Sequence, residues 1–366
     1  MLLALCIIVM LFAGCAHTEE LLDDSLSAEQ PLTVLDWENS TLSMICWGAA
    51  APRVYVLPDG DLIAGYESTN AIYTAISDDG GKTWKERTKA TFYPELACAN
   101  VNFFHDGQRL YLAYRAVGYQ EEGFYSSLQI SVSSDNGKSW EVHSTIVENL
   151  EISNQFRGVW EPCLGILNGE LACFYANDSR SITDFQNIEC QIWRNGEWTD
   201  RSVISKGDSH NSRDGMPVWM QLKCGTYVCV IESTKYRGEG NSMMIQLLWS
   251  DDGVKWSEPV DIFRNDNSGE MSGAPGIAEL PSGQLVISFQ TNAGTPTQDN
   301  SIMWTLLSDG TEVHQLTAKA FGSPQSVFGQ KDGGLSMWTG LHYHDGILYA
   351  AAGTRYGAMV NILHIE

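Results

Sequence analysis

Two regular ladders of residues restrict what this chain of 366 residues can fold into. The first is a hairpin-like motif that ends in tryptophan: SDDGGKTW at 77–84 returns as SSDNGKSW at 133–140 and as SDDGVKW at 250–256, with a degenerate copy, WRNGEW, at 193–198. The closing tryptophans are Trp84, Trp140, Trp198 and Trp256. Their separations are 56, 58 and 58 residues. A constant period of this length is typical of a repeat protein.

Short β-rich runs, each centred on a turn glycine, form the second ladder. These glycines are Gly60, Gly107, Gly169, Gly225, Gly283 and Gly346. They span 286 residues in five intervals, a mean of about 57 residues that matches the first ladder. Each tryptophan follows its glycine by 24 to 33 residues, so one repeat holds two hairpins and four strands. Six such units predict an all-β, six-bladed β-propeller. An open sandwich is the alternative, but it would not need equal repeats.

The last repeat is one strand short. About 20 residues follow Gly346, which suffices for two more strands. The segment LTVLDWEN at 32–39 is the expected donor of the missing outer strand, and this pairing would close the ring through the N-terminal chain. A closed ring leaves few exposed strand edges. We therefore expect the propeller domain to span 32–366.

The residues before the propeller are typical of a targeting segment and a tether. An apolar run too short to span a bilayer ends in LFAGC, which resembles a bacterial lipobox with Cys15 as the lipidated residue. Phe12 stands where leucine is usual, no basic residue precedes it, and a plain secretory signal is the alternative. We expect a signal segment at 1–15, an acidic tether at 16–31, and a bacterial envelope protein attached to the membrane only by lipid, outside the cytoplasm.

Charge and cysteine content argue against several kinds of partner. The chain has 22 Lys and Arg against 45 Asp and Glu, a net charge of −23 at pH 7. Nucleic-acid binding needs clustered basic residues, so it is not expected, and a neutral substrate is favoured over a polyanion. Of the nine cysteines, Cys6 would leave with the signal and Cys15 would carry lipid. The other seven have no metal-binding spacing, which predicts buried thiols and no metal site. Neither a cofactor nor an obligate protein partner is indicated.

The repeat geometry predicts where a functional site would lie. Residues before the first strand and after the second strand of a blade share one face, opposite the turn glycine. The tryptophan hairpins fall on the other face, so we interpret them as structural. Many positions near the predicted mouth are polar: Arg53, Glu67, Asn100, Arg115, Glu161, Asn177, Glu232 and Gln290.

Two of these positions are glutamates on adjacent blades. Glu161 begins the innermost strand of blade three in VWEPCLGIL, and Glu232 ends the second strand of blade four in TYVCVIES. Burial raises the pKa of a carboxyl group, and two close carboxyls drive their pKa values apart. A pair about 5–5.5 Å apart suits retaining glycoside hydrolysis. The alternative is that both glutamates only accept hydrogen bonds from backbone amides at the strand ends.

The tryptophan motifs match the Asp-box of sialidase-like propellers, which indicates fold rather than activity. More specific are PRVYVLPDGDLIAGY, GVWEPCLGILNGELACFY, SRDGMPVWMQLKCGTYVCVIES and SGAPGIAELPSGQLVISFQT. Over roughly 45–355 the chain resembles glycoside hydrolase family 93, the exo-acting α-L-1,5-arabinanases. The resemblance implies an oligo- or polysaccharide substrate, net retention, no metal, and two catalytic glutamates, which Glu161 and Glu232 match. It does not settle their roles; we favour Glu161 as nucleophile and Glu232 as acid/base.

Six further residues are expected to bind substrate: Arg53, Trp160, Asn177, Asp178, Asp214 and Gln290. Most have a structural alternative. Arg53 either contacts sugar hydroxyls or pairs with Glu67, and Trp160 either stacks on a sugar ring or packs in the core. Asp214 either faces the site or caps the turn at Gly215.

Two other functions compete with arabinan hydrolysis. A sialidase holds the substrate carboxylate with three arginines and uses a tyrosine nucleophile. Arg53 resembles the first of these arginines, but the strand starts SGAPG and MWTG in blades five and six carry none. A non-catalytic glycan-binding lipoprotein would keep the tryptophan and asparagine at the mouth without needing both glutamates.

Arg115 either binds substrate or bridges two blades, and His342 and His344 are expected to be structural.

Overall fold

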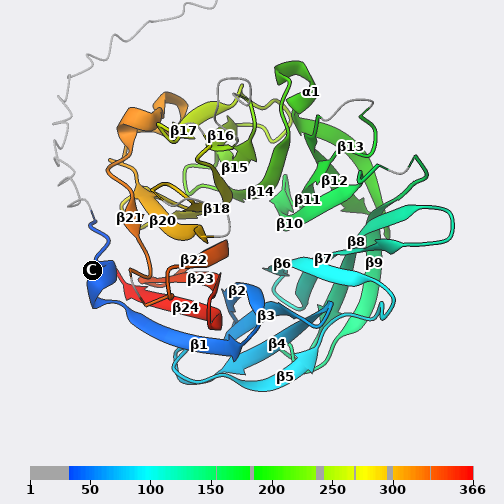
Figure 1. Ribbon diagram of the computed structural model, residues 1–366, viewed down its shortest axis with the longest axis horizontal. Coiled ribbons are helices and arrows are strands. Elements are labelled where there is room, and N and C mark those ends of the chain that lie inside the picture. Colours follow the sequence, from blue (N-terminus) through cyan, green and yellow to red (C-terminus); the bar gives the residue numbers. More distant parts are fainter. Residues whose placement is uncertain are drawn as a thin grey trace, which may run out of the picture. The chain divides into compact units, whose positions relative to one another are not determined.

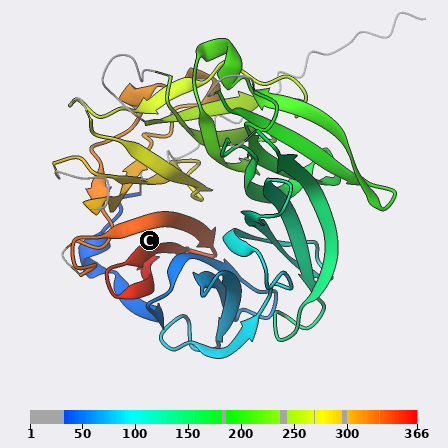
Figure 2. The same cartoon turned by 45° about the vertical axis from the view of Figure 1, so that its right-hand side comes forward.

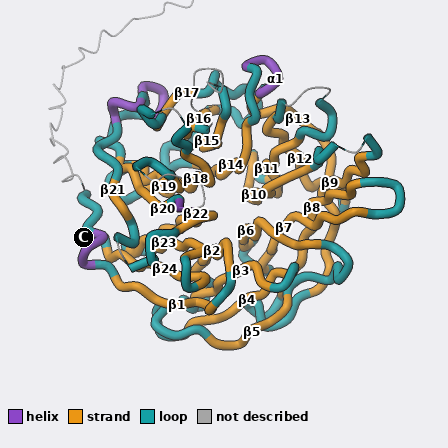
Figure 3. Tube along the Cα trace, in the orientation of Figure 1, coloured by secondary structure: helices purple, strands orange, loops and turns teal. Residues whose placement is uncertain are grey.

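A computed structural model describes residues 33–153, 155–181, 185–235, 243–267, 269–294, 300–329 and 331–365. They belong to one compact unit, Leu32–Glu366. Within them, six four-stranded antiparallel sheets stand radially around a centre (Figure 1), and strands make up most of the trace (Figure 3). The predicted six-bladed propeller is confirmed. The predicted signal segment, Cys15 and the tether lie outside the described residues.

In each blade, the strands follow one another from the centre of the ring outward. Blade one holds β2 (Ala50–Val56), β3 (Leu62–Ser68), β4 (Ala71–Ser77) and β5 (Lys85–Lys89). Blade two holds β6 (Ala97–His105), β7 (Leu110–Tyr119), β8 (Phe124–Ser133) and β9 (Glu141–Glu151). Blade three holds β10 (Val159–Leu167), β11 (Glu170–Asn177), β12 (Asn187–Arg194) and β13 (Glu197–Ser205).

The second half of the ring repeats this order. Blade four holds β14 (Asp214–Gln221), β15 (Tyr227–Ser233), β16 (Met244–Ser250) and β17 (Val260–Phe263). Blade five holds β18 (Ser272–Glu279), β19 (Leu285–Thr291), β20 (Ile302–Leu307) and β21 (Gln325–Ser326). Blade six holds β22 (Ser336–His344), β23 (Ile347–Thr354), β24 (Gly357–His364) and, as its outer strand, β1 (Thr41–Trp47).

The hydrophobic core lies between neighbouring blades. The second strands are buried on both faces and are therefore nearly continuous runs of apolar residues, as in YVCVI at 227–231. Between blades three and four, the rings of Phe174 and Trp219 stack with centroids 4.3 Å apart. The described part of the chain contains no helix long and apolar enough to cross a membrane.

The N-terminal chain does close the ring, but not with the predicted segment. The strand that pairs antiparallel with β24 is Thr41–Trp47, not 32–39 (Figures 1 and 2). In TLSMICW, alternate side chains are buried, which suits an edge strand with one covered face. The predicted donor segment instead packs against the ring through two buried side chains, Leu35 and Trp37. The Trp37 indole donates a hydrogen bond of 2.8 Å to Thr305 Oγ1 in blade five.

The Asp-box turns lie on the same face as the turn glycines, as predicted. In the box of blade two, Asp135 Oδ1 accepts the Ser139 N–H at 2.8 Å. Beside it, the Asn136 amide donates 2.6 Å to Asp59 Oδ2 in the Gly60 turn of blade one. These turns therefore join neighbouring blades on the face opposite the predicted mouth.

Each innermost strand in the described ring carries a bulge near its start, at the mouth. The ladder to the second strand shifts register there. One residue of each bulge has φ between 46° and 58°: Ala51, Asn100, Glu161, Met216, Ala274 and Trp338. Bulges re-aim side chains and backbone amides at functional sites. Glu161 is itself one of these residues.

Candidate active site

Side chains at the mouth bind the bulge of the next blade through its backbone N–H. Glu67 accepts the Asn100 N–H at 2.8 Å, Glu232 accepts the Ala274 N–H at 2.8 Å, and Gln290 accepts the Trp338 N–H at 2.6 Å. These three acceptors occupy the same register position of their second strands, opposite the residue that precedes the bulge. The contact is therefore a repeated feature of the ring, and a carboxamide serves it as well as a carboxylate.

Blades two, three and six depart from this pattern, because Arg115, Ala176 and Gly353 hold the equivalent position and none of them has an acceptor side chain. In blade three this residue is Ala176, opposite Trp160. The N–H of Met216 in the next bulge donates instead to Glu161 Oε2 at 3.0 Å. One carboxylate oxygen of Glu161 and one of Glu232 thus accept a backbone N–H, as the structural interpretation of these two glutamates predicts.

Glu161 and Glu232 line one cavity of about 210 Å³ at the mouth, between blades two, three and four. The other described residues that line it are Arg115, Phe156, Trp160, Gln186, Arg213 and Met243. The predicted meeting of the two glutamates on adjacent blades is therefore present. A cavity walled by two carboxylates, two guanidinium groups and two aromatic rings can bind a polar ring and exchange protons with it.

The surroundings of the two carboxylates differ. The pKa of Glu232 is raised to about 7, mainly by burial and secondly by the charge of Glu161. The Ala274 N–H and Arg213 lower this pKa, but by less. Burial also raises the pKa of Glu161, but the Met216 N–H, Arg115 and Arg213 oppose this shift. The two carboxyl groups titrate together. When the pair holds a single proton, Glu232 carries it and Glu161 is ionised.

Two glycines make the slot in which the Glu232 carboxylate lies. A Cβ at Gly273 would lie 2.5 Å from Glu232 Oε2, and a Cβ at Gly215 would lie 3.0 Å from Glu232 Oε1. Both glycines directly precede bulge residues, in blades five and four. A methyl group at Gly273 would displace the oxygen that accepts the Ala274 N–H, and one at Gly215 would crowd the other carboxylate oxygen.

Asp178 lies behind the cavity wall and holds two of its members. Its side chain is 1% exposed. Oδ1 accepts hydrogen bonds from the Gly158 N–H at 2.7 Å and from the Trp160 indole at 2.9 Å, and Oδ2 pairs with Arg213 at 3.0 Å. Arg213 also donates to Gln186 Oε1 at 2.7 Å. Asp178 therefore positions the cavity wall instead of lining the cavity.

Asn177 and Asp214 are also buried and do not line the cavity. Asn177 donates to Glu189 Oε2 at 2.9 Å and accepts the Ser179 N–H at 2.9 Å. Asp214 accepts the hydroxyls of Ser212 and Ser233 at 2.6 and 2.9 Å. Their polar atoms face neighbouring strands and loops. Of the six predicted substrate-binding residues, only Trp160 lines the cavity that contains both glutamates.

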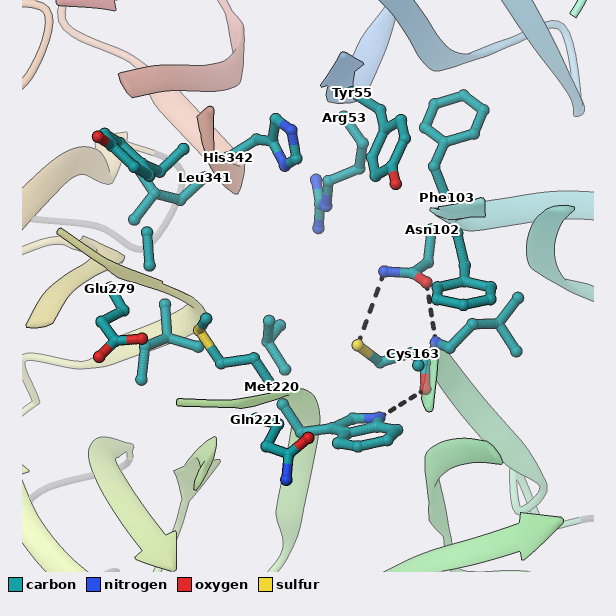
Figure 4. A pocket seen from close by; sticks show the side chains of 18 of the residues that line it. Arg53, Tyr55, Asn102, Phe103, Cys163, Met220, Gln221, Glu279, Leu341 and His342 are labelled. Carbon is teal, nitrogen blue, oxygen red and sulfur yellow. Dashed lines mark hydrogen bonds between the residues drawn. The ribbon is translucent and has the colours of Figure 1, made fainter. Parts of the chain in front are cut away.

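Arg53 and Gln290 lie farther around the ring. Arg53 donates to the carbonyl oxygens of Pro52 and Trp338 at 3.0 and 2.8 Å, which joins blades one and six, and burial lowers its pKa to about 10. It lines a larger cavity of about 450 Å³ in the central channel, together with His342 and Cys163 (Figure 4). Gln290 holds the bulge of blade six. Neither residue lines the cavity of the two glutamates.

The sequence interpretation missed several residues of the cavity. Gln186 and Arg213 lie on connecting segments that form an isolated bridge, so no strand periodicity marks them. Phe156 belongs to the connection between β9 and β10. The sequence predicts that Arg115 either binds substrate or bridges two blades. Its guanidinium lies 5.3 Å from the Trp160 ring centroid, so it joins blades two and three, and it also lines the cavity.

Comparison with known proteins gives likeness in structure only. No family model and no curated protein matches the chain. An α-L-arabinanase from Penicillium chrysogenum, complexed with arabinobiose, has a TM-score of 0.63 and 17% identity over 91% of this chain and 99% of that chain. A family 93 α-L-arabinofuranosidase of Fusarium graminearum has 0.58 and 17% over 86% and 93%. The NanB sialidase of Streptococcus pneumoniae has 0.59 and 10% over 87% and 70%. These likenesses show a shared propeller fold.

Proposed function

We propose that this protein is a retaining exo-glycoside hydrolase of the family 93 type, which releases units from the non-reducing end of α-1,5-L-arabinan-like glycans. The observation that carries the proposal is the cavity in which Glu161 and Glu232 meet in unequal electrostatic surroundings. The fold shared with an arabinanase and an arabinofuranosidase supports the substrate class.

In the first step, Glu232 acts as the acid. Its raised pKa keeps a proton available near neutral pH, and this proton passes to the glycosidic oxygen as the bond to the anomeric carbon breaks. Glu161 attacks the anomeric carbon and forms a glycosyl ester. Arg115 and Arg213 favour its ionised form, which the nucleophile requires.

In the second step, Glu232 acts as the base. Once Glu161 is an ester it carries no charge, so the repulsion that raises the pKa of Glu232 is removed. The resulting carboxylate takes a proton from water, whose oxygen attacks the anomeric carbon and displaces Glu161. Two displacements on opposite faces of the sugar give net retention.

The size of the cavity supports attack at a chain end. At about 210 Å³ it is smaller than the roughly 300–1,000 Å³ of sites for drug-sized ligands. We infer that it encloses one terminal sugar unit and leaves the rest of the glycan outside.

A direct test is to incubate the protein from residue 30 onward with linear arabinan, sialyllactose and aryl glycosides. We expect arabinose or short arabino-oligosaccharides from arabinan and no sialic acid. Arg115 and Arg213 are the feature that favours a sialidase, but no tyrosine is among the described residues that line the cavity. Release of sialic acid alone would overturn the proposal, and binding of arabinan without hydrolysis would favour a non-catalytic glycan-binding protein.

We also propose that the protein is a lipoprotein of the bacterial cell envelope, attached through Cys15. Its support is the lipobox-like LFAGC motif. Labelled palmitate should be incorporated into the full-length protein and not into a Cys15→Ser variant. Equal labelling of the two would contradict the anchor.

A further inference from the structure

We propose that an aromatic shelf beside the cavity, formed by Tyr119, Phe124, Phe156 and Trp160, binds the second sugar unit of the substrate. This inference rests on the proposed function. The rings of the shelf touch in sequence. Centroids lie 5.1 Å apart between Trp160 and Phe156, 4.3 Å between Phe156 and Phe124, and 5.4 Å between Phe124 and Tyr119. Because Trp160 and Phe156 also line the cavity, the shelf begins where the glutamates lie.

Blade two supplies the outer part of the shelf because its strands are longer than those of blade one. β7, β8 and β9 have 10, 10 and 11 residues, whereas β3, β4 and β5 have 7, 7 and 5. Arg115 holds the register position of Glu67. One strand residue follows Glu67, but four follow Arg115. Three additional residues extend blade two by about 10 Å beyond this level of the mouth.

The extension presents one face to blade three. Side chains two apart along a strand share a face, so Arg115, Val117 and Tyr119 lie on the same side of β7. Val117 packs in one hydrophobic cluster with Phe124 and Trp160 of the shelf. Blade two therefore forms a wall on one side of the cavity, and Tyr119 stands near the end of that wall.

The shelf combines supported rings with exposed ones. Phe124 and Trp160 are buried, whereas Phe156 and Tyr119 are 61% and 80% exposed. Single exposed apolar residues are ordinary, but a row of touching rings that continues from a cavity indicates a binding surface. The C–H face of a sugar ring can stack on such rings. The cavity accommodates one unit, so the next unit of the glycan must leave past its rim, where Phe156 lies.

The test compares substrates with one and three sugar units. We expect Phe156→Ala to lower the ratio of kcat/KM for arabinotriose to that for methyl α-L-arabinofuranoside by about fivefold to tenfold. That factor corresponds to roughly 40–55 Å² of covered apolar surface at about 25 cal/mol per Å². Phe156→Tyr keeps the ring and should keep the ratio. Trp47→Ala is the matched control, because Trp47 is 73% exposed but belongs to blade six, across the ring.

Binding to an inactivated protein separates the shelf from the reaction. Calorimetry with Glu232→Gln should give a Kd for arabinotriose that Phe156→Ala weakens by a similar factor. An unchanged ratio and Kd, or an equal change with Trp47→Ala, would overturn the shelf. If the wild-type protein hydrolyses neither substrate, the proposed function fails. The titration then decides alone: a Kd that depends on Phe156 supports the shelf, and absent or Phe156-independent binding overturns it.

Discussion

Replacing Gly273 by alanine should remove most of the activity without unfolding the protein. The new Cβ would lie 2.5 Å from Glu232 Oε2, whereas ordinary contacts begin at 3.4 Å, so the carboxylate must retreat by 0.9 Å. A misplacement of about 1 Å in a catalytic group can lower the rate about 10²-fold. That factor is equivalent to about 2.7 kcal/mol of transition-state stabilisation.

The same substitution should cost little stability. The φ of Gly273 is outside the left-handed region, so alanine is compatible with the backbone. The atom that must move is the end of a side chain. Loss of the 2.8 Å hydrogen bond from the Ala274 N–H costs about 1 kcal/mol. A Gly→Ala change at a compatible position returns about 0.4–1 kcal/mol by restricting the unfolded chain.

The assay is kcat/KM on linear arabinan together with the melting temperature. Gly322→Ala is the control, because its nearest atom would be the Leu307 carbonyl oxygen at an ordinary 3.8 Å. Gly273→Ala should lose about 10²-fold in kcat/KM with a melting temperature close to that of the control. Full activity in Gly273→Ala would refute the reasoning that the slot fixes a catalytic carboxylate.

Three other predictions follow from the same structure. The pH profile of kcat/KM should fall above about pH 7, because Glu232 must be protonated to act as an acid and its pKa is about 7, and should fall at low pH as Glu161 is protonated; a rate that keeps rising beyond pH 8 would contradict these roles. Trp140→Ala should destabilise the fold by roughly 3–5 kcal/mol, since this buried indole also donates to Thr74 Oγ1 at 3.2 Å, while the folded fraction keeps its activity; a loss of activity at unchanged melting would place the Asp-box near the site. A chain that starts at 48 lacks β1 and its six paired positions, so at about 0.5–1.5 kcal/mol per lost hydrogen bond its free energy of unfolding should be several kcal/mol lower than that of a chain that starts at 30. Its unfolding midpoint in denaturant should fall accordingly, and equal midpoints would disprove ring closure by this strand.

The sequence predicts the propeller because every repeat must bury its faces against the next one, and this requirement appears as a period. The same periodicity places Glu161 and Glu232 at the mouth. The periodicity did not locate the closing strand. Leu35 and Trp37 make the segment 32–39 apolar, but they pack this segment against the ring without forming a strand. The alternation in 41–47 was the better signal.

Depth within the mouth could not be predicted from position along the strands. Asp178 and Asp214 lie at strand ends as expected, but partners from other segments hold them. Gly158, Trp160 and Arg213 bind Asp178, and Ser212 and Ser233 bind Asp214. Those partners bury both carboxylates behind the wall. Arg213 reaches the cavity from a connection whose path no repeat determines. Spacing therefore predicted the face of the molecule, and packing decided which side chains reach the cavity.

The most direct test of the paired glutamates compares three glutamate-to-glutamine variants: Glu161→Gln, Glu232→Gln and, as control, Glu67→Gln. Glu67 also accepts a bulge N–H but does not line the cavity, and Gln290 fulfils the same contact naturally with a carboxamide. Glutamine should therefore preserve the structural hydrogen bond and remove only ionisation. With an activated aryl α-L-arabinofuranoside and azide, NMR of the products gives the anomeric configuration.

We predict that Glu67→Gln keeps wild-type activity, while the other two variants lose at least 10²-fold on arabinan. Azide should restore turnover of Glu232→Gln and give the α-azide with retained configuration. In Glu161→Gln, any azide product should be the inverted β-azide, because no covalent intermediate can form. Equal activity of all three variants on arabinan would contradict the catalytic pair, and an exchange of the two azide products would reverse the roles of Glu161 and Glu232.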